Sequence, residues 1–303
     1  MTIAIQTAGL TKVLNGVSVV KDVSLSIPEG TICGVVGANG AGKTTLLRLL
    51  HGIMWPTSGE IQLFGQPMPR ESAPLRQRIG YVASEGTIYP SFRVQDLIEF
   101  SASLYERWDA QRCRRLLDAL QLPKRQLIRQ LSLGMRMQLR LVIRLCTHPD
   151  VLLLDEPTNG LDAVIKRQFL QLILDEALND GTTIVMATHL LPDLERMADS
   201  VVVMYKGRMI ADGVIDDLKT KFRGYQVVLP NGMPSSVAKS ERVLQTEQRG
   251  AVWTVIVDDI DGELEQVLRQ ASTHFETVPQ SLEDIFTHVL RREGYSREAI
   301  LLS

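Results

Sequence analysis

Short apolar runs recur along the first two thirds of the chain, and stretches with helical periodicity separate them. The runs that we interpret as strands cover residues 31–36, 61–64, 79–82, 151–154, 182–187 and 201–205. Continuous apolar runs of this length are typical of strands that are buried on both faces of a sheet. Helical patterns cover residues 43–51 and much of 94–146. This alternation predicts an α/β fold in which helices cover a mostly parallel sheet.

The pattern changes near residue 222. Residues 225–229 and 252–257 alternate between apolar and polar side chains, as half-exposed strands do, and the segment 230–250 between them is polar and rich in turn residues. Helical patterns follow at 262–271 and 281–292, the second with Ser281 and Asp284 placed as a helix N-terminal cap. We therefore predict two domains, a large one at 1–222 and a small α+β appendage at 223–303.

Composition and charge narrow the class of protein. The chain has 303 residues, of which 45% are hydrophobic and 22% are charged, with a formal net charge of −2. This balance is ordinary for a globular protein and argues against nucleic acid as a partner. Cys33, Cys113 and Cys146 are far apart and lack metal-ligand spacing, so we expect free thiols in a reducing cytoplasm. The sequence contains neither a signal-peptide pattern nor an apolar stretch of spanning length, so any membrane part must come from another polypeptide.

One motif predicts a phosphate site. The pattern G-x-x-x-x-G-K-[ST], which follows the apolar run 31–36 and opens the predicted helix, is matched by Gly37, Ala38, Asn39, Gly40, Ala41, Gly42, Lys43 and Thr44. Glycines let consecutive backbone N–H groups point at one anion, and the helix N-terminus adds a positive potential. We expect Lys43 to bridge the β- and γ-phosphates and the Thr44 hydroxyl to bind Mg²⁺, and we include Thr45 among the nucleotide-binding residues. The competing interpretation is a glycine turn before an ordinary helix.

A second motif supplies candidate hydrolytic groups. Asp155 and Glu156 follow the buried run 151–154, and ligands bind at the carboxyl ends of strands in open α/β sheets. Asp155 is placed to hold Mg²⁺ with Thr44, and Glu156 to polarise the attacking water. His189, just past the run 182–187, is a candidate sensor of the γ-phosphate, although a solvated histidine is the competing interpretation.

A segment between these two motifs resembles a motif of a known family. The segment Leu131-Ser132-Leu133-Gly134-Met135 resembles the L-S-G-G-Q signature of ABC ATPases. The other motifs of the family occur in the family's order along the chain. Asn159-Gly160-Leu161-Asp162 resembles the loop after the Asp155 strand, and His189 resembles the switch histidine. The resemblance covers about residues 3–220. It implies a P-loop NTPase of ABC type, with a mixed sheet core, an antiparallel β subdomain, a helical signature subdomain, and ATP and Mg²⁺ as cofactors.

The resemblance also implies a dimer. Two cassettes would pair head to tail, so that Ser132, Gly134 and Asp162 of one copy complete the nucleotide site around Lys43 of the other. The sequence departs from the family pattern in three ways. Leu14 stands where an aromatic ring usually contacts adenine, and Tyr81 is the other candidate ring. Ser84, followed by Glu85, stands where a glutamine is usual, and Leu133 and Met135 replace signature residues.

The leading functional hypothesis is the ATP-hydrolysing subunit of an exporter at the cytoplasmic face of the cell membrane. A separate integral membrane permease would dock on the region 84–105. The segment 281–286, Ser-Leu-Glu-Asp-Ile-Phe, resembles the tail of bacterial drug-exporter ATPases and favours export. Two alternatives stay open: a nucleotide-binding regulator with little turnover, and a soluble ABC protein that does not serve transport.

Overall fold

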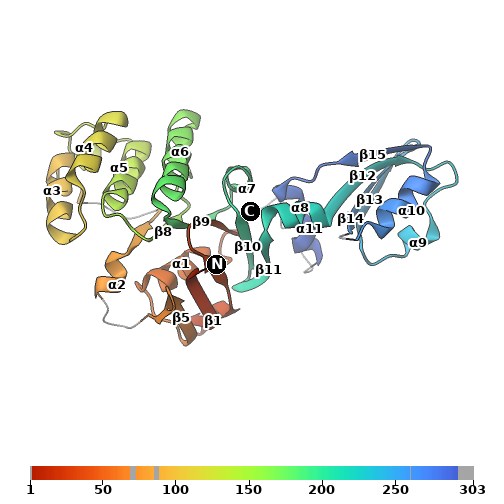
Figure 1. Cartoon of the computed structure of the whole chain (residues 1–303), viewed down its shortest axis with the longest axis horizontal. Coiled ribbons are helices and arrows are strands. Elements are labelled where there is room, and N and C mark those ends of the chain that lie inside the picture. Colours follow the sequence, from red (N-terminus) through yellow and green to blue (C-terminus); the bar gives the residue numbers. More distant parts are fainter. Residues whose placement is uncertain (1, 69–72, 85–88, 260, 293–303) are drawn as a thin grey trace.

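The structure, a computed structural model, describes residues 2–68, 73–84, 89–259 and 261–292. Its elements form three groups along the long axis (Figure 1). Helices of the predicted signature region lie at one end, two sheets lie in the middle, and a separate small sheet lies at the other end. No helix in these ranges has the length and apolar composition needed to cross a bilayer.

The central sheet has six strands and carries the candidate site. Its order is β11 (Arg208–Val214), β10 (Ser200–Tyr205), β4 (Ile32–Val36), β9 (Thr183–Thr188), β8 (Val151–Asp155) and β7 (Ile79–Val82). All neighbours pair in parallel except β10 and β11. Every residue of β4, β8 and β9 is buried, as their unbroken apolar runs predict. The mostly parallel sheet is therefore confirmed, and its antiparallel edge makes it mixed.

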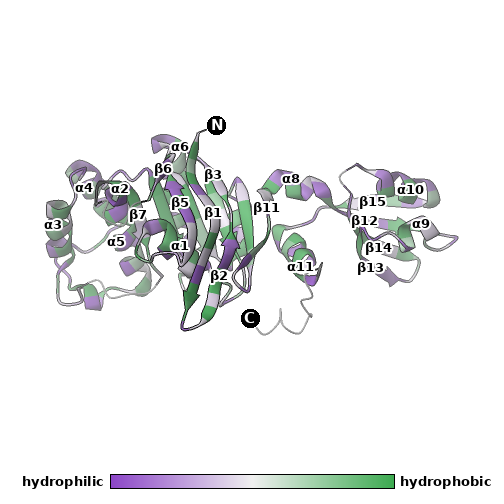
Figure 2. Ribbon diagram, turned by 90° about the horizontal axis from the view of Figure 1, so that it is seen from below, coloured by the Kyte–Doolittle hydropathy of each residue, from purple (hydrophilic) through white to green (hydrophobic). Residues whose placement is uncertain are grey.

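A second, antiparallel sheet packs below the first. It contains β2 (Val17–Val23), β1 (Ile3–Leu14), β5 (Ser58–Leu63) and β6 (Gln66–Pro67), with β3 (Ser26–Pro28) also paired to β1. Helix α1 (Lys43–His51) shares one core with both sheets, because Leu46, Leu47, Leu49 and Leu50 are fully buried in it. Figure 2 shows these strands beside α1. Burial of this leucine face explains why residues 43–51 fold as a helix.

The helical subdomain has a core of its own. It consists of α3 (Val94–Leu104), α4 (Ala110–Ala119), the short η1 (Ile128–Gln130) and α5 (Leu133–Leu145), packed around Val94, Leu117 and Leu139. Helices α6 (Ala163–Asp180) and α7 (Leu191–Glu195) cover the other face of the central sheet through residues such as Phe169 and Leu194. Helix α2 (Ala73–Gln77) precedes β7.

The C-terminal part forms a four-stranded antiparallel sheet with its own core. The order is β13 (Val243–Arg249), β14 (Val252–Asp258), β12 (Phe222–Val228) and β15 (His274–Val278), with α9 (Ser235–Ala238) and α10 (Glu263–Ala271) packed against it. The segment 230–250, which the sequence marks as polar and rich in turn residues, also contains α9 and β13, which the sequence analysis does not predict. Strand β13 is an edge strand whose residues are half or fully exposed, so it lacks the alternation that marks a strand in a sequence.

Helix α11 (Leu282–Arg292) confirms the helical pattern at 281–292 but lies away from that small sheet's core. Leu282, Phe286 and Val289 pack on the core of the central sheet, beside α7 and α8 (Ile215–Lys221). The guanidinium of Arg291 donates to Gln245 Oε1 at 2.6 Å, which ties α11 to β13. The chain thus returns from the appendage and fastens it to the large domain.

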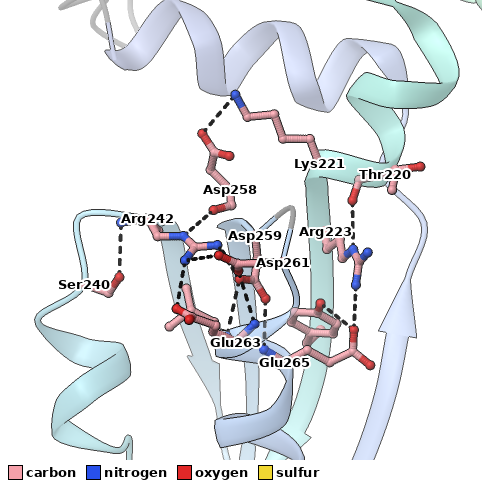
Figure 3. A network of polar contacts seen from close by, with 12 residues as sticks. Thr220, Lys221, Arg223, Ser240, Arg242, Asp258, Asp259, Asp261, Glu263 and Glu265 are labelled. Atoms are coloured by element: carbon pink, nitrogen blue, oxygen red, sulfur yellow. Dashed lines mark hydrogen bonds and ion pairs between the residues drawn. The ribbon is translucent and has the colours of Figure 1, made fainter.

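A network of ion pairs and hydrogen bonds connects the sheet of the appendage to α10 (Figure 3). The guanidinium of Arg242 lies 2.7 Å from Asp259 Oδ1 and 2.5 Å from Asp261 Oδ1. The Asp259 carboxylate is fully buried and also accepts from the Glu265 backbone N–H at 3.0 Å, at the start of α10. Nearby, Arg223 donates to Glu265 Oε2 at 2.8 Å. These bonds hold α10 on its sheet.

Candidate nucleotide-binding site

The predicted phosphate loop joins β4 to α1, and close backbone contacts fix its path. Gly42 adopts φ 105°, and a Cβ there would lie 2.5 Å from the Val19 carbonyl oxygen. A Cβ on Gly37 would lie 2.4 Å from the Met204 carbonyl oxygen. Any larger residue at either position would displace neighbouring backbone, so glycine is required by the fold as well as by the motif.

The rest of the loop is arranged around the start of α1. Gly207 N–H donates to Ala41 O at 3.0 Å, which holds the loop against the turn between β10 and β11. Asn39 and Gly40 are exposed and Ala38 is half-buried, so this stretch of backbone faces outward. Thr45 is half-buried in the first turn of α1. The free N–H groups of a helix N-terminus favour a bound anion at this position.

Lys43 is buried and points back along the loop. Its Nζ donates to Gly37 O at 2.7 Å and lies 3.1 Å from Glu156 Oε1. Burying an ammonium group is costly unless it is paired, and the loop carbonyl and the carboxylate provide partners. The ammonium is therefore held between the phosphate loop and the end of β8.

The oxygens of Thr44 and Asp155 meet at the predicted metal position. Thr44 Oγ1 donates to Asp155 Oδ1 at 2.9 Å, and the Tyr81 hydroxyl donates to Asp155 Oδ2 at 3.2 Å. Burial raises the pKa of Asp155, and burial together with Asp155 raises the pKa of Tyr81 to about 12. A hydroxyl and a carboxylate are oxygen donors of the kind Mg²⁺ prefers, and one or two protein ligands beside phosphates are usual for it. These residues therefore fit Mg²⁺, although no group of three acidic, histidine or cysteine ligands occurs in the described ranges.

Glu156 sits at a strained turn with its carboxylate held from two sides. It adopts φ 47°, which is uncommon outside glycine, while its N–H donates to Ala187 O at 2.8 Å. Its Oε2 lies 2.8 Å from His189 Nδ1, and its Oε1 contacts Lys43. Such strain concentrates at functional sites because the surrounding structure must maintain it. The structure thus brings together the five side chains that the sequence singles out for phosphate, metal and water: Lys43, Thr44, Asp155, Glu156 and His189.

The remaining predicted residues form a second group at the starts of α5 and α6. Ser132 caps α5 by accepting from Met135 N–H at 3.1 Å, and Asp162 caps α6 by accepting from Val164 N–H and Ile165 N–H, both at 3.0 Å. Gly134 lies against Ile165, since a Cβ there would be 2.8 Å from Ile165 Cδ1. Within one chain, therefore, these residues hold two helix N-termini next to each other.

The two residues considered for contact with adenine, Leu14 and Tyr81, can now be placed in the structure. Tyr81 turns its hydroxyl to Asp155 and packs its ring against His51, with centroids 5.6 Å apart, so its hydroxyl belongs to the metal position. A tyrosine three residues before Ser84 carries no signal in the sequence that would reveal this contact. Leu14 pairs with Val17 across the end of the β1–β2 hairpin and both are exposed. Glu85 lies outside the described residues.

Comparisons with known proteins identify the family of the chain. Residues 20–159 match the family described as ABC transporter. The chain is 31% identical to the ABC transporter ATP-binding protein YtrB of Bacillus subtilis, over 91% of this chain and 94% of that protein. It is 32% identical to the Nod factor export ATP-binding protein I of Cupriavidus metallidurans, over 97% of this chain and 99% of that protein.

The fold of the chain is also similar to that of a solved ABC transporter subunit. A solved structure described as the ATP binding subunit of an ABC transporter superposes with a TM-score of 0.65 at 26% identity, over 71% of this chain and 92% of that one. The fold that carries this site is therefore a known architecture. This chain belongs to the family of ABC transporter ATP-binding proteins, and its nucleotide-binding domain is an ABC ATPase.

Proposed function

We propose that two copies of this chain close head to tail around two ATP molecules and drive export through a separate integral membrane permease. The observation that carries the proposal is the gathering of Lys43, Thr44, Asp155, Glu156 and His189 at the ends of β4, β8 and β9. A cation, a hydroxyl, two carboxylates and an imidazole can bind phosphate, hold a metal ion and position a water, which are the tasks of phosphoryl transfer to water.

Each group has a role in this proposal. Lys43 and the N–H groups at the start of α1 bind the β- and γ-phosphates, and Thr44 with Asp155 would hold Mg²⁺. The metal, when bound, neutralises charge on the phosphate oxygens. The Glu156 carboxylate orients the attacking water and accepts its proton, while His189, bonded to Oε2, fixes that carboxylate and senses the γ-phosphate.

We propose a second copy because of Ser132, Gly134 and Asp162 at the starts of α5 and α6, which we call the signature group. Ser132 and Asp162 place the N-termini of α5 and α6 side by side, and Leu133 and Val164 beside them are 46% and 68% exposed. Apolar side chains exposed next to helix N-termini suit a surface that closes on another copy and its bound anion. Removal of the γ-phosphate by hydrolysis would then open the pair, which gives a two-state element able to move a permease.

The permease would dock on the region 84–105, of which residues 85–88 lie outside the described ranges. Tyr89 stacks on Phe92 with centroids 4.9 Å apart, and Phe100 meets Tyr89 edge-on at 5.6 Å. Tyr89, Phe100 and Leu104 are all exposed. This aromatic patch suits an apolar helix of a partner. The export direction is proposed because the relative from C. metallidurans is named for export, and a permease partner would place the chain at the cytoplasmic face of the membrane.

The mass of the purified chain in solution tests the proposal. The Glu156→Gln variant, in which hydrolysis is slow, is expected to be a monomer without nucleotide and a dimer with saturating ATP and Mg²⁺, as measured by light scattering. Adding Lys43→Met to this variant removes the phosphate-binding cation and should abolish the dimer. A Glu156→Gln chain that binds ATP and Mg²⁺ yet remains monomeric would refute the head-to-tail mechanism.

A further inference from the structure

The carboxylate of Asp155 is held by two hydroxyl groups, one on each oxygen. Thr44 supplies the first at 2.9 Å and Tyr81 the second at 3.2 Å. Asp155 is 1% exposed, so its orientation depends on protein partners and hardly on water. Thr44 is the predicted metal ligand, whereas Tyr81 has no role in the mechanism above.

Tyr81 is itself fixed at three points. Its backbone belongs to β7, where it pairs with Leu153 of β8, two residues before Asp155. Its ring packs against His51 of α1, and its carbonyl oxygen accepts from Arg144 Nε at 3.2 Å. A hydroxyl held this way is already aligned with the carboxylate and loses little freedom when it donates to it.

The same segment is tied to the helix that begins with the signature. Arg140 and Arg144 both lie on α5, which Ser132 caps. Arg140 donates to Ala83 O at 2.8 Å, and Arg144 contacts the hydroxyl of Tyr105, the residue that directly follows α3. Two arginines on successive turns of α5 thus hold the backbone from Tyr81 to Ala83. A movement of α5 would be transmitted to Tyr81 and, through its hydroxyl, to Asp155.

We propose that Tyr81 is a positioning residue for the metal carboxylate, holding Asp155 Oδ2 and linking its orientation to the signature helix α5. Groups bonded to a metal-binding carboxylate typically change metal affinity by about 10- to 100-fold when removed. This inference rests on the proposed nucleotide site.

The test is the effect of Mg²⁺ on ATP affinity in a Glu156→Gln background, measured by calorimetric titration with Mg²⁺ and with EDTA. The ratio of the two affinities reports how strongly metal and nucleotide bind together. Tyr81→Phe removes only the hydroxyl, so it should lower this ratio about tenfold while the affinity in EDTA stays within about twofold. An unchanged ratio, or an equal loss of affinity with and without metal, would overturn the proposal.

Tyr225→Phe is the matched control. The Tyr225 hydroxyl donates to Glu265 Oε2 at 3.1 Å in the appendage, so this variant loses the same kind of bond at a remote place. It should leave the ratio as it is in the background chain, and a drop equal to that of Tyr81→Phe would also count against a role for Tyr81. Failure of the background chain to bind ATP at all would instead refute the proposed nucleotide site.

Discussion

His189 Nδ1 lies 2.8 Å from Glu156 Oε2, while Lys43 Nζ lies 3.1 Å from the other oxygen of the same carboxylate. Glu156, which we propose activates the water, is thus held by His189 at the end of β9 and by Lys43 of α1. Together with the His189 backbone N–H, which donates to Oε2 at 3.3 Å, these donors leave the carboxylate little freedom to rotate. This suits a base that must meet one water in one orientation.

The first prediction concerns Glu156. Glu156→Gln keeps the shape of the side chain but cannot accept a proton, so phosphate release should fall by about 10²- to 10⁴-fold. ATP affinity should be retained, because Lys43 and the start of α1 are unchanged. Glu195→Gln, a change in the partly exposed pair with Lys219, is the control and should leave the rate intact.

Phosphate release at the wild-type rate in Glu156→Gln would assign water activation to another residue. Background turnover in the unmodified chain together with its permease would instead favour the regulator hypothesis.

The second prediction concerns His189. His189→Ala removes the imidazole donor to Glu156 Oε2 and leaves only the longer bond from the His189 backbone N–H at 3.3 Å. We expect phosphate release to fall by about 10²-fold with ATP binding preserved. His189→Gln retains a donor and should recover part of the rate. A His189→Ala chain that turns over normally would show that Lys43 and the backbone N–H of residue 189 are sufficient to orient the carboxylate.

The third prediction concerns packing within the signature group. Gly134→Ala adds a methyl 2.8 Å from Ile165 Cδ1 and 3.1 Å from its Cγ2, so we expect a loss of about 1–3 kcal/mol in the free energy of unfolding. Ile165→Val removes the nearer methyl and should recover part of the loss in the double variant. Urea unfolding measures both. Gly213→Ala is the control, because a methyl there meets nothing closer than 3.5 Å and should cost far less.

The fourth prediction is a pH dependence that originates at His51. Burial lowers the pKa of His51 from 6.5 to about 4, and its Nδ1 has no hydrogen-bond partner among the residues that the structure describes. The unfolded chain therefore binds a proton more readily than the folded chain, so stability falls as pH drops from above 6.5 towards 4. At about 1.4 kcal/mol per pKa unit, we expect a loss of about 2 kcal/mol between pH 7 and pH 5.

Urea unfolding of the wild type and His51→Gln at these two pH values isolates that contribution. The loss on acidification should be smaller by about 2 kcal/mol in the variant, since glutamine does not titrate. An equal loss in both proteins would mean that His51 is protonated as easily in the folded chain as in the unfolded one.

The fifth prediction tests the division at residues 222 and 223. Asp259→Asn weakens the bonds that the buried carboxylate accepts from Arg242 and from Glu265 N–H, so the appendage should lose about 1.5–3 kcal/mol of stability. ATPase activity should be unchanged if the appendage folds as its own unit. Trp253 fluorescence, in a Trp55→Phe/Trp108→Phe background, reports unfolding of the small sheet. Asp261→Asn, an exposed member of the same network, should have a smaller effect. A single transition shared with the large domain would contradict two separate units.

The sequence by itself determined the parts whose chemistry depends on neighbours along the chain. The phosphate loop is one continuous segment, so its glycines, Lys43 and Thr44 could be identified without coordinates. Asp155 and Glu156 follow a buried strand directly, and parallel strands bring their carboxyl ends to one edge. The five core side chains of the site were predicted for that reason.

Tertiary structure alone decided the features that join distant segments. Tyr81 reaches Asp155 only because β7 lies beside β8, and Arg144 reaches Tyr81 only because α5 packs on β7. Helix α11 has a clear helical pattern, yet which core its apolar face would cover depended on the whole fold. Apolar periodicity specifies that a face will be buried, whereas the partner that buries it is fixed by the arrangement of all the elements together.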